Sequence, residues 1–382
     1  MKRIISLILV SLLTLSVLFC FAGCGKVNNA EVAVLWSGEG EATNPNSLIN
    51  SMDRAMYIKK VDCTYYGAKG DAEKQLEQAL EALENGCQVL VVELVVDLID
   101  LFQSRAQEIV NAAKEKDVPV VFFNCVVADA IVNSYDKCVL VSTDLLSKAD
   151  VQGELMADYV KSNFKKIDKN ADGKLDCVFR GVDLVTAGAA IDKANELLAT
   201  EDYKVKTEDG EEINTSIEIA DVALTKAEVI LTESDIMAYD VLSRIQESDY
   251  NTDKLTTQFI PIFTAGSDYD YKDRVLEGKP ADSKDLAKYL EAKKFLVDLT
   301  NVAEEDLDDM IYTTTNVIDA GRIAGTATED KDSIALAVAG IVRNLCKGDD
   351  TFKGIASKVK EGETPAVVVD GSFVKVRYIA YN

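Results

Sequence analysis

The 382-residue sequence contains no histidine. This absence excludes Ser-His-Asp and Cys-His catalytic sites and histidine-based metal centres, because each of them needs an imidazole. Nucleotide-binding motifs are also lacking. The stretch "GEGEAT" lacks the last glycine of GxGxxG, and "GAKGDAEK" lacks the GK[ST] of a P-loop. Carboxylates are so abundant that no glycosidase pair stands out. The sequence therefore predicts a protein that is not an enzyme.

Proline and paired cysteines are scarce. Five prolines in the whole chain are too few to mark a linker between domains. No CxxC pair is present, and the cysteines that follow residue 24 stand singly, at Cys63, Cys87, Cys125, Cys138, Cys177 and Cys346. Most of them lie in apolar runs. Buried free thiols are therefore favoured over a disulfide framework.

Positive charge is also in short supply. The chain has 41 basic and 65 acidic residues, a formal charge of −24. Without the first 23 residues, which contain two basic residues and no acidic one, the charge is −26. Nucleic acids and anionic membrane surfaces would repel such a chain. We expect no nucleic-acid partner.

A long hydrophobic run is present only at the N-terminus. Lys2 and Arg3 precede about twenty apolar residues, enough either for a secretory signal over residues 1–23 or for a membrane anchor. The stretch "FAGC" resembles a bacterial lipobox, in which Cys24 becomes the lipidated first residue, although Phe21 stands where the pattern prefers Leu. We favour a lipoprotein held on the membrane by this lipid anchor. All three alternatives place the rest of the chain outside the cytoplasm.

Apolar strands alternate with amphipathic helices from residue 31 onward. In "DAEKQLEQALEALENG" a helix is expected with Leu76, Leu80 and Leu83 on one stripe and Gly86 as its C-terminal cap. The alternation restarts after "KCVLVSTD", and "YKVKTEDGEEINTS" is expected to form a hairpin. The pattern predicts two α/β domains, each with a doubly wound parallel sheet. Ligands of such sheets bind beyond the carboxyl ends of the strands.

An acidic loop, "DKNADGKLD", matches the start of an EF-hand calcium loop. Its matching residues are Asp168, Asn170, Asp172, Gly173 and Asp176. Alternating oxygen ligands on a tight glycine turn suit calcium, which takes six to eight hard oxygens. The twelfth position, which is a bidentate Glu in an EF-hand, is Phe179, and an apolar strand follows instead of a helix. The alternative is an ordinary acidic surface turn.

At "VPVVFFN", "NSYDKCVLVSTD" and "DKNADGKLDCVF" the chain resembles the bacterial galactose/glucose-binding protein family. The similarity runs from about residue 75 to residue 200 and returns at "AEVILTESDIMA", "AGRIAGTATEDKDS" and "FVKVRYIAY". This resemblance implies a sugar-binding subunit of an ABC transporter, with the type 1 periplasmic-binding fold and a membrane permease as its partner.

The resemblance also implies a domain organisation in which the chain crosses between two hinged lobes near Thr143, Glu329 and Ser372. After a signal peptide over residues 1–23, the N-terminal lobe would contain residues 24–143 and 330–371. The C-terminal lobe, with the calcium loop, would contain residues 144–329 and 372–382.

In this family the missing calcium carboxylate comes from a distant Glu that precedes a strand of the same domain. Here that residue is Glu228, in "AEVIL". The ligands that the resemblance implies for Ca²⁺ are Asp168, Asn170, Asp172, the carbonyl of Lys174, Asp176 and Glu228.

The resemblance is weaker at the sugar site. Asn124 matches a family ligand contact, and Glu329 replaces a late hinge Asn. The other family contacts are replaced by Val185, Ala187, Ile191, Ser234 and Gly266, and the stacking Trp has no counterpart. Each buried sugar hydroxyl left unpaired costs about 1–3 kcal/mol, so galactose is not expected to bind at the usual micromolar level.

Further pocket candidates stay open. Trp36 is either a stacking surface or a core aromatic, and Glu39 and Glu41 are either hydrogen-bond acceptors or solvated loop acids. The sequence thus predicts an extracytoplasmic binding subunit for a monosaccharide or another small solute, with a structural calcium ion. The alternative is a degenerate surface lipoprotein that kept the fold and the calcium site but binds another ligand or partner. The long segments 201–228 and 267–310 have no functional interpretation.

Overall fold

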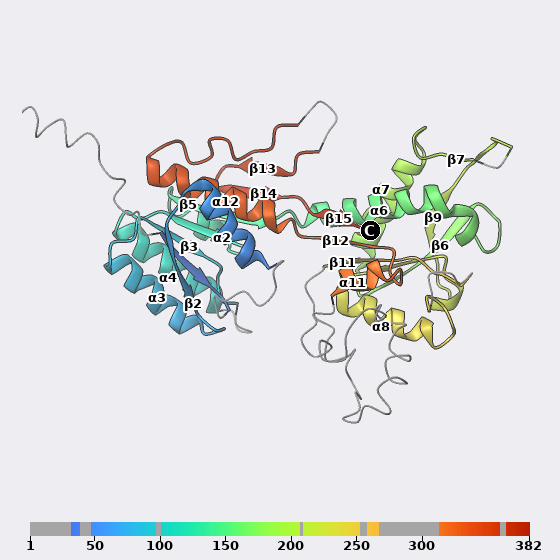
Figure 1. The fold of residues 1–382 in the computed structure, drawn as a ribbon, viewed down its shortest axis with the longest axis horizontal. Helices are drawn as coiled ribbons and strands as arrows, with labels where there is room; N and C mark the ends of the chain where they lie inside the picture. The colour runs from blue at the N-terminus through green and yellow to red at the C-terminus, as the bar shows by residue number, and fades with distance from the viewer. Residues whose placement is uncertain are drawn as a thin grey trace, which may run out of the picture. The chain divides into compact units, whose positions relative to one another are not determined.

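A computed structural model describes residues 32–38, 47–96, 101–206, 209–252, 258–266, 313–359 and 364–382, with residues 101–102 described by their backbone alone. The chain divides into two compact units. Unit 1 comprises Met1–Ser142, Asp332–Lys358 and Val367–Val374, and unit 2 comprises Thr143–Lys331, Val359–Ala366 and Lys375–Asn382. Each unit is a sheet covered by helices (Figure 1).

The described part of unit 1 contains a seven-stranded sheet in the order β13-β14-β5-β4-β3-β1-β2. Its strands are β1 (Val32–Trp36), β2 (Cys63–Gly67), β3 (Val89–Val92), β4 (Val120–Phe123), β5 (Cys138–Thr143), β13 (Val367–Asp370) and β14 (Phe373–Val376). The strands β2, β1, β3, β4 and β5 pair in parallel. Their carboxyl ends therefore lie along one edge, called the carboxyl edge below.

Helices cover both faces of this sheet (Figure 1). They are α2 (Leu48–Lys59), α3 (Ala72–Glu84), α4 (Leu101–Glu115), the short α5 (Asp129–Val132) and α12 (Lys331–Lys347). Side-chain caps begin two of them: Ser47 accepts a hydrogen bond from Asn50 N in α2, and Asp71 accepts from two amides in α3. Gly86 follows α3 with a φ of +82°, as expected of a left-handed C-terminal residue.

The predicted stripe on α3 is wrong at Leu80. Leu83 is 4% exposed, but Leu80 is 40% exposed, and the buried neighbours of these leucines are Ala79 and Ala82. The helix packs on both β1 and α4, and small side chains let its backbone approach them closely. Close packing therefore places the alanines, and not Leu80, on the buried face of α3.

The described part of unit 2 contains a six-stranded sheet in the order β15-β12-β11-β10-β6-β9. Its strands are β6 (Lys174–Arg180), β9 (Ser216–Ile219), β10 (Val229–Thr232), β11 (Ile262–Ala265), β12 (Gly325–Thr328) and β15 (Ile379–Tyr381). All the pairs are parallel except that of β12 with β15. The predicted hairpin is confirmed as the antiparallel pair β7 (Val205–Lys206) and β8 (Glu212–Ile213).

Two layers of helices sandwich this second sheet. The helices are α6 (Leu146–Ile167), α7 (Leu184–Leu198), α8 (Asp235–Gln246) and α11 (Thr314–Asp319), with a 3₁₀ turn η1 (Leu224–Lys226) before β10. Residues of α6 and α7 share a core with Leu231 and Phe263, whereas residues of α8 and α11 share one with Ile230 and Ile262 (Figure 1). Both units are thus doubly wound α/β sheets, which confirms the predicted fold class.

Tryptophan and cysteine, which are scarce in this chain, have structural positions in the described part. Trp36 is 1% exposed and packs edge-on against Phe123, so of its two interpretations the core aromatic is right. None of the six cysteines of the described residues forms a disulfide, and Cys87, Cys138 and Cys177 are buried. No helix of the described part is both long and apolar enough to cross a bilayer. Cys24, Glu39 and Glu41 lie outside the described residues.

Candidate functional site

Three polar residues meet at the carboxyl edge of unit 1. Ser37 follows β1, Glu93 follows β3 and Asn124 follows β4. Ser37 Oγ donates to Glu93 Oε2 at 2.6 Å, and Ser37 N donates to the same oxygen at 3.2 Å. Asn124 Nδ2 donates to Glu93 Oε1 at 2.7 Å. The carboxylate is thus held from both sides, with its oxygens at the ends of three neighbouring strands.

Glu93 was missed by the sequence interpretation. It ends the run "QVLVVE", so its signal was a carboxylate placed directly after a buried strand. Asn124, which the resemblance indicated, lies at this edge with a left-handed φ of +50°. Asn tolerates that conformation better than most residues. The turn aims its amide at Glu93.

A second polar group lies at the carboxyl edge of unit 2. Glu233 directly follows β10 and forms an ion pair with Lys148 of α6 at 2.6 Å. One turn later on α6, Gln152 Nε2 donates to the carbonyl oxygen of Thr232, the last residue of β10, at 3.2 Å. Gln152 is 1% exposed, and its Oε1 has no hydrogen-bond partner. A buried acceptor without a hydrogen-bond donor therefore lies near the ion pair.

Glu329 lies just beyond β12 in the same unit. Thr143 Oγ1 donates to Glu329 Oε1 at 3.0 Å. Burial raises the pKa of Tyr378 to about 12, and the charges of Glu329 and Glu233 add to the rise. Glu329 and Glu233 thus both lie within electrostatic range of Tyr378, although the resemblance indicated Glu329 alone.

A buried carboxylate occupies the space beside Gly266. Gly266 follows β11 with a φ of +99°, and a Cβ placed there would lie 2.8 Å from Asp235 Oδ2. Asp235 begins α8 and is 5% exposed. An acidic group from the neighbouring strand end therefore lies where a side chain at position 266 would stand. Ser234, just before Asp235, has the capping position of α8 but makes no side-chain cap bond.

The replaced family positions on α7 do not form a group. Ala187 is fully buried and Ile191 is 5% exposed, so both belong to the core between α6 and α7. Val185, in contrast, is 82% exposed at the start of the helix.

The acidic loop connects α6 to β6. Gly173 has a φ of +85°, and its N–H donates to Asp168 Oδ2 at 3.2 Å. Asn170 Oδ1 accepts from Asp172 N at 3.0 Å, and Asp172 Oδ1 accepts from Lys174 N at 2.8 Å. These side-chain-to-backbone bonds hold the tight turn in place.

The structure places Glu228 against this loop. Its carboxylate, 2% exposed, accepts hydrogen bonds from Lys169 N at 2.5 Å and from Asp176 N at 2.9 Å, although 52 residues separate it from Asp176. Asp168 Oδ1 is buried and has no hydrogen-bond partner. A buried carboxylate oxygen without a donor is an unmet charge, which a cation would neutralise.

The loop has oxygen ligands of the kind that calcium takes, but the directions in which they point suit the ion less well. Carboxylate, amide and carbonyl oxygens are the hard ligands that Ca²⁺ takes. Among the described residues, however, no three Cys, Asp or Glu side chains gather as a metal site would require. Asp168 Oδ2, Asn170 Oδ1 and Asp172 Oδ1 accept from backbone amides instead. Side chains of the loop would have to turn toward the unpartnered oxygen of Asp168 to hold an ion.

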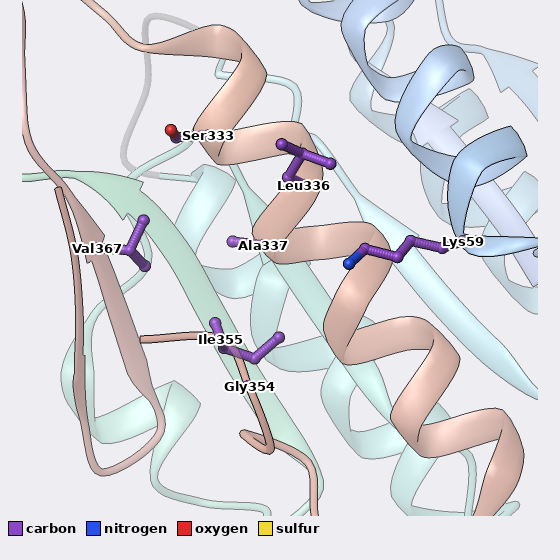
Figure 2. A pocket seen from close by; sticks show the side chains of 7 residues that line it. All are labelled: Lys59, Ser333, Leu336, Ala337, Gly354, Ile355 and Val367. Carbon is purple, nitrogen blue, oxygen red and sulfur yellow. The ribbon is translucent and has the colours of Figure 1, made fainter. Parts of the chain in front are cut away.

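Two hollows in unit 1 lie apart from the carboxyl-edge residues. One, of about 210 Å³, is lined by Lys59, Ser333, Leu336, Ala337, Gly354, Ile355 and Val367 (Figure 2). The other, of about 730 Å³, lies beside α2 and the start of β2. Neither is lined by Ser37, Glu93 or Asn124. The first is smaller than the 300–1,000 Å³ typical of ligand pockets and has mostly apolar walls.

The sequence is similar to several known proteins. It is 35% identical over 85 residues to the D-galactose/methyl-galactoside binding periplasmic protein MglB of Haemophilus influenzae, a stretch that is 22% of this chain and 25% of that protein. The match therefore spans about a quarter of the length of this relative.

Two solved structures are also similar. One is the periplasmic binding protein component of the arabinose ABC transporter of Shewanella, bound to L-arabinofuranose, with 11% identity, a TM-score of 0.43, and coverage of 92% of this chain and 91% of that one. The other is an ABC transporter solute binding protein of Bacillus halodurans with bound myo-inositol, with 13% identity, a TM-score of 0.41, and coverage of 85% and 92%.

The family assignment rests on a longer match. The profile of the periplasmic binding protein domain matches residues 33–284, more than half of the chain and segments of both units. With its two doubly wound sheets, this chain belongs to the periplasmic binding protein domain family.

Proposed function

We propose that this protein is an extracytoplasmic solute-binding subunit of an ABC transporter, and that its solute carries several hydroxyl groups, as a carbohydrate does. Family membership supports the class of protein. The observation that carries the solute assignment is Glu93, fixed by Ser37 and Asn124 at the carboxyl edge of unit 1. A carboxylate held in one position is a strong acceptor for ligand hydroxyls.

The mechanism that we propose is a shift between two conformations of the protein. A solute favours the conformation that it binds more tightly, by its difference in affinity for the two states. The solute-bound form then docks on the permease. Lipidation at Cys24 would keep the protein at the membrane beside that partner.

We also propose that the acidic loop holds a structural calcium ion. The residues that would hold it are Asp168, Asn170, Asp172, the Lys174 carbonyl, Asp176 and Glu228. The ion would supply positive charge to a buried acidic turn and stabilise unit 2. The solute would not touch it, because the loop precedes β6 at the edge of the sheet opposite the carboxyl edge.

The solute assignment is tested by a thermal-shift screen of monosaccharides, polyols and non-hydroxylated solutes in calcium buffer. A ligand at about 1,000 times its dissociation constant adds about 4 kcal/mol to the stability of the folded protein. We expect a hydroxylated solute to raise the melting temperature, and Glu93→Gln to weaken its binding at least tenfold. Glu115→Gln removes the same charge at an exposed position of α4 and should leave binding unchanged.

A panel in which no solute shifts the melting temperature would favour the degenerate surface lipoprotein. A shift by non-hydroxylated solutes alone would reject the carbohydrate-like assignment and keep the solute-binding fold.

The calcium proposal is tested by unfolding in calcium and in chelator. We expect calcium to raise the free energy of unfolding, and Glu228→Gln to abolish this gain. The variant should also lose about 1–3 kcal/mol of stability in chelator. In the wild type both Glu228 oxygens accept from backbone N–H groups, and the Gln amide nitrogen cannot accept from one of them. Asp192→Asn, an exposed change on α7, is the control. Equal stability of the wild type in both buffers would reject the site.

A further inference from the structure

Large apolar side chains are exposed at the carboxyl edge of unit 2. Five of them form what we call the apolar rim: Leu145, Leu146, Leu184, Val185 and Met237, exposed by 66%, 83%, 64%, 82% and 40%. They stand at or just before the first turns of α6, α7 and α8. Single exposed aliphatic residues need no explanation, but a contiguous group marks a binding surface.

The rim residues lie near one another. The helices α6 and α7 both start at the carboxyl edge and pack closely, because a Cβ at Gly153 would lie 2.5 Å from the carbonyl oxygen of Ala190. Leu146 lies about two turns before Gly153 on α6, and Leu184 lies about two turns before Ala190 on α7. The two leucines are therefore at the same height on the two helices. Met237 joins them from α8, since its Cγ lies 3.1 Å from the Cβ position of Gly181, which follows β6.

Polar side chains border the apolar rim. The Cβ of Glu233 lies 3.2 Å from the same Gly181 position, so the ion pair of Glu233 with Lys148 borders the rim. The Glu233 side chain is 40% exposed, so its carboxylate can also accept hydrogen bonds from a bound solute.

The rim differs from a surface for a bare sugar ring. Sugar rings stack their C–H faces on aromatic side chains. Among the described residues at the carboxyl edges, Trp36 is 1% exposed, Phe123 is fully buried and Tyr378 is 8% exposed. The exposed side chains of the rim carry no aromatic ring and suit an apolar chain.

We propose that the apolar rim binds the apolar body of an amphiphilic solute, whose hydroxylated head is bound by the acceptors of the same edge. An alkyl glycoside has this chemistry. The inference rests on the proposed function and specifies its substrate class: a sugar-like head with an apolar substituent.

The test measures binding of methyl, butyl and hexyl β-D-glucosides and β-D-galactosides by titration calorimetry, below the micelle concentration and in calcium buffer. Each methylene that the rim buries should tighten binding about fourfold. We expect the double variant Leu146→Ser, Val185→Ser to lose this dependence on chain length while binding methyl glycosides within twofold of the wild type. Leu80→Ser, on the exposed side of α3 in unit 1, should keep it.

The outcomes separate the two proposals. Equal affinities for methyl and hexyl glycosides would reject the rim and leave the proposed function in place. Equal binding of hexyl glycosides and the sugar-free tetraethylene glycol monohexyl ether would keep the rim and reject the sugar-like head. Absence of binding by every probe would reject the rim as a site for alkyl glycosides, whereas only the broader solute panel can reject the proposed function.

Discussion

At the scale of single residues, the site of unit 1 depends on one strained backbone position. Asn124 holds a φ of +50° and directs its amide to Glu93. Left-handed backbone costs an ordinary L-residue about 1–2 kcal/mol, and a β-branched residue suffers most. The position is therefore suited to Asn for two reasons, conformation and hydrogen bonding.

We predict that Asn124→Val and Asn124→Gly separate these two reasons. Both variants lose the bond to Glu93, but glycine adopts the left-handed conformation freely. Asn124→Val should lose about 1–2 kcal/mol more stability than Asn124→Gly in urea unfolding, whereas solute binding should weaken equally in both. Equal stabilities of the two variants would contradict the role of the backbone.

The sequence indicates some residues of the site but not others, for a physical reason. Glu228 was expected at the acidic loop because the resemblance supplied it, and the structure places it there, 52 residues from Asp176. Glu93 had no motif; only the topology of the parallel sheet brings it to Ser37 and Asn124. Asp235 fits beside β11 because position 266 is glycine, a match of two distant positions that no local pattern encodes.

At the scale of elements, α6 and α7 pack so closely that one glycine is required. A Cβ at Gly153 would lie 2.5 Å from the Ala190 carbonyl and 2.7 Å from the Lys193 Cβ. Gly188 on the facing helix α7 has nothing within 4 Å of its Cβ position. The two glycines therefore offer a matched comparison.

We predict opposite effects of alanine at these glycines. Gly153→Ala should lose about 1–3 kcal/mol, because the added methyl forces the helices apart. Gly188→Ala should gain about 0.5–1 kcal/mol from its better helix propensity. Chemical denaturation measures both, and a gain in stability at position 153 would contradict the close packing. The exposed rim residues on these helices should also move in Gly153→Ala, so glycoside binding is a second readout.

The elements themselves were the most predictable feature. Buried strands such as β3 and β4 are continuous apolar runs, and α6 has an unbroken amphipathic pattern, so their sequences leave little choice of structure. The failure at Leu80 has a different origin. Periodicity identifies a helix, but which part of its surface is buried depends on neighbouring elements, and here β1 and α4 selected alanines.

At the scale of the whole molecule, each of the two sheets contains a fully buried cysteine thiol. Cys138 begins β5 in unit 1 and Cys177 lies in β6 of unit 2, and both are fully buried. Burial raises the pKa of each thiol from 9.0 to about 12, with a smaller contribution from Cys125 at Cys138. Each unit therefore carries a core thiol that ionises at a lower pH in the unfolded chain than in the folded one.

We predict that this arrangement makes the protein sensitive to alkali. Above pH 9 the unfolded chain loses the thiol protons while the folded chain keeps them, so ionisation stabilises the unfolded state. Stability is complete below pH 9 and falls as the pH rises toward 12. Between pH 9 and pH 10 each thiol should cost about 1 kcal/mol of unfolding free energy.

Urea unfolding with a reductant present measures this slope. Cys177→Ala should lower it by one thiol's share, whereas Val178→Ala, a truncation of the neighbouring residue in β6, should lower stability and leave the slope unchanged. The same slope in Cys177→Ala as in the wild type would contradict the assignment to this thiol.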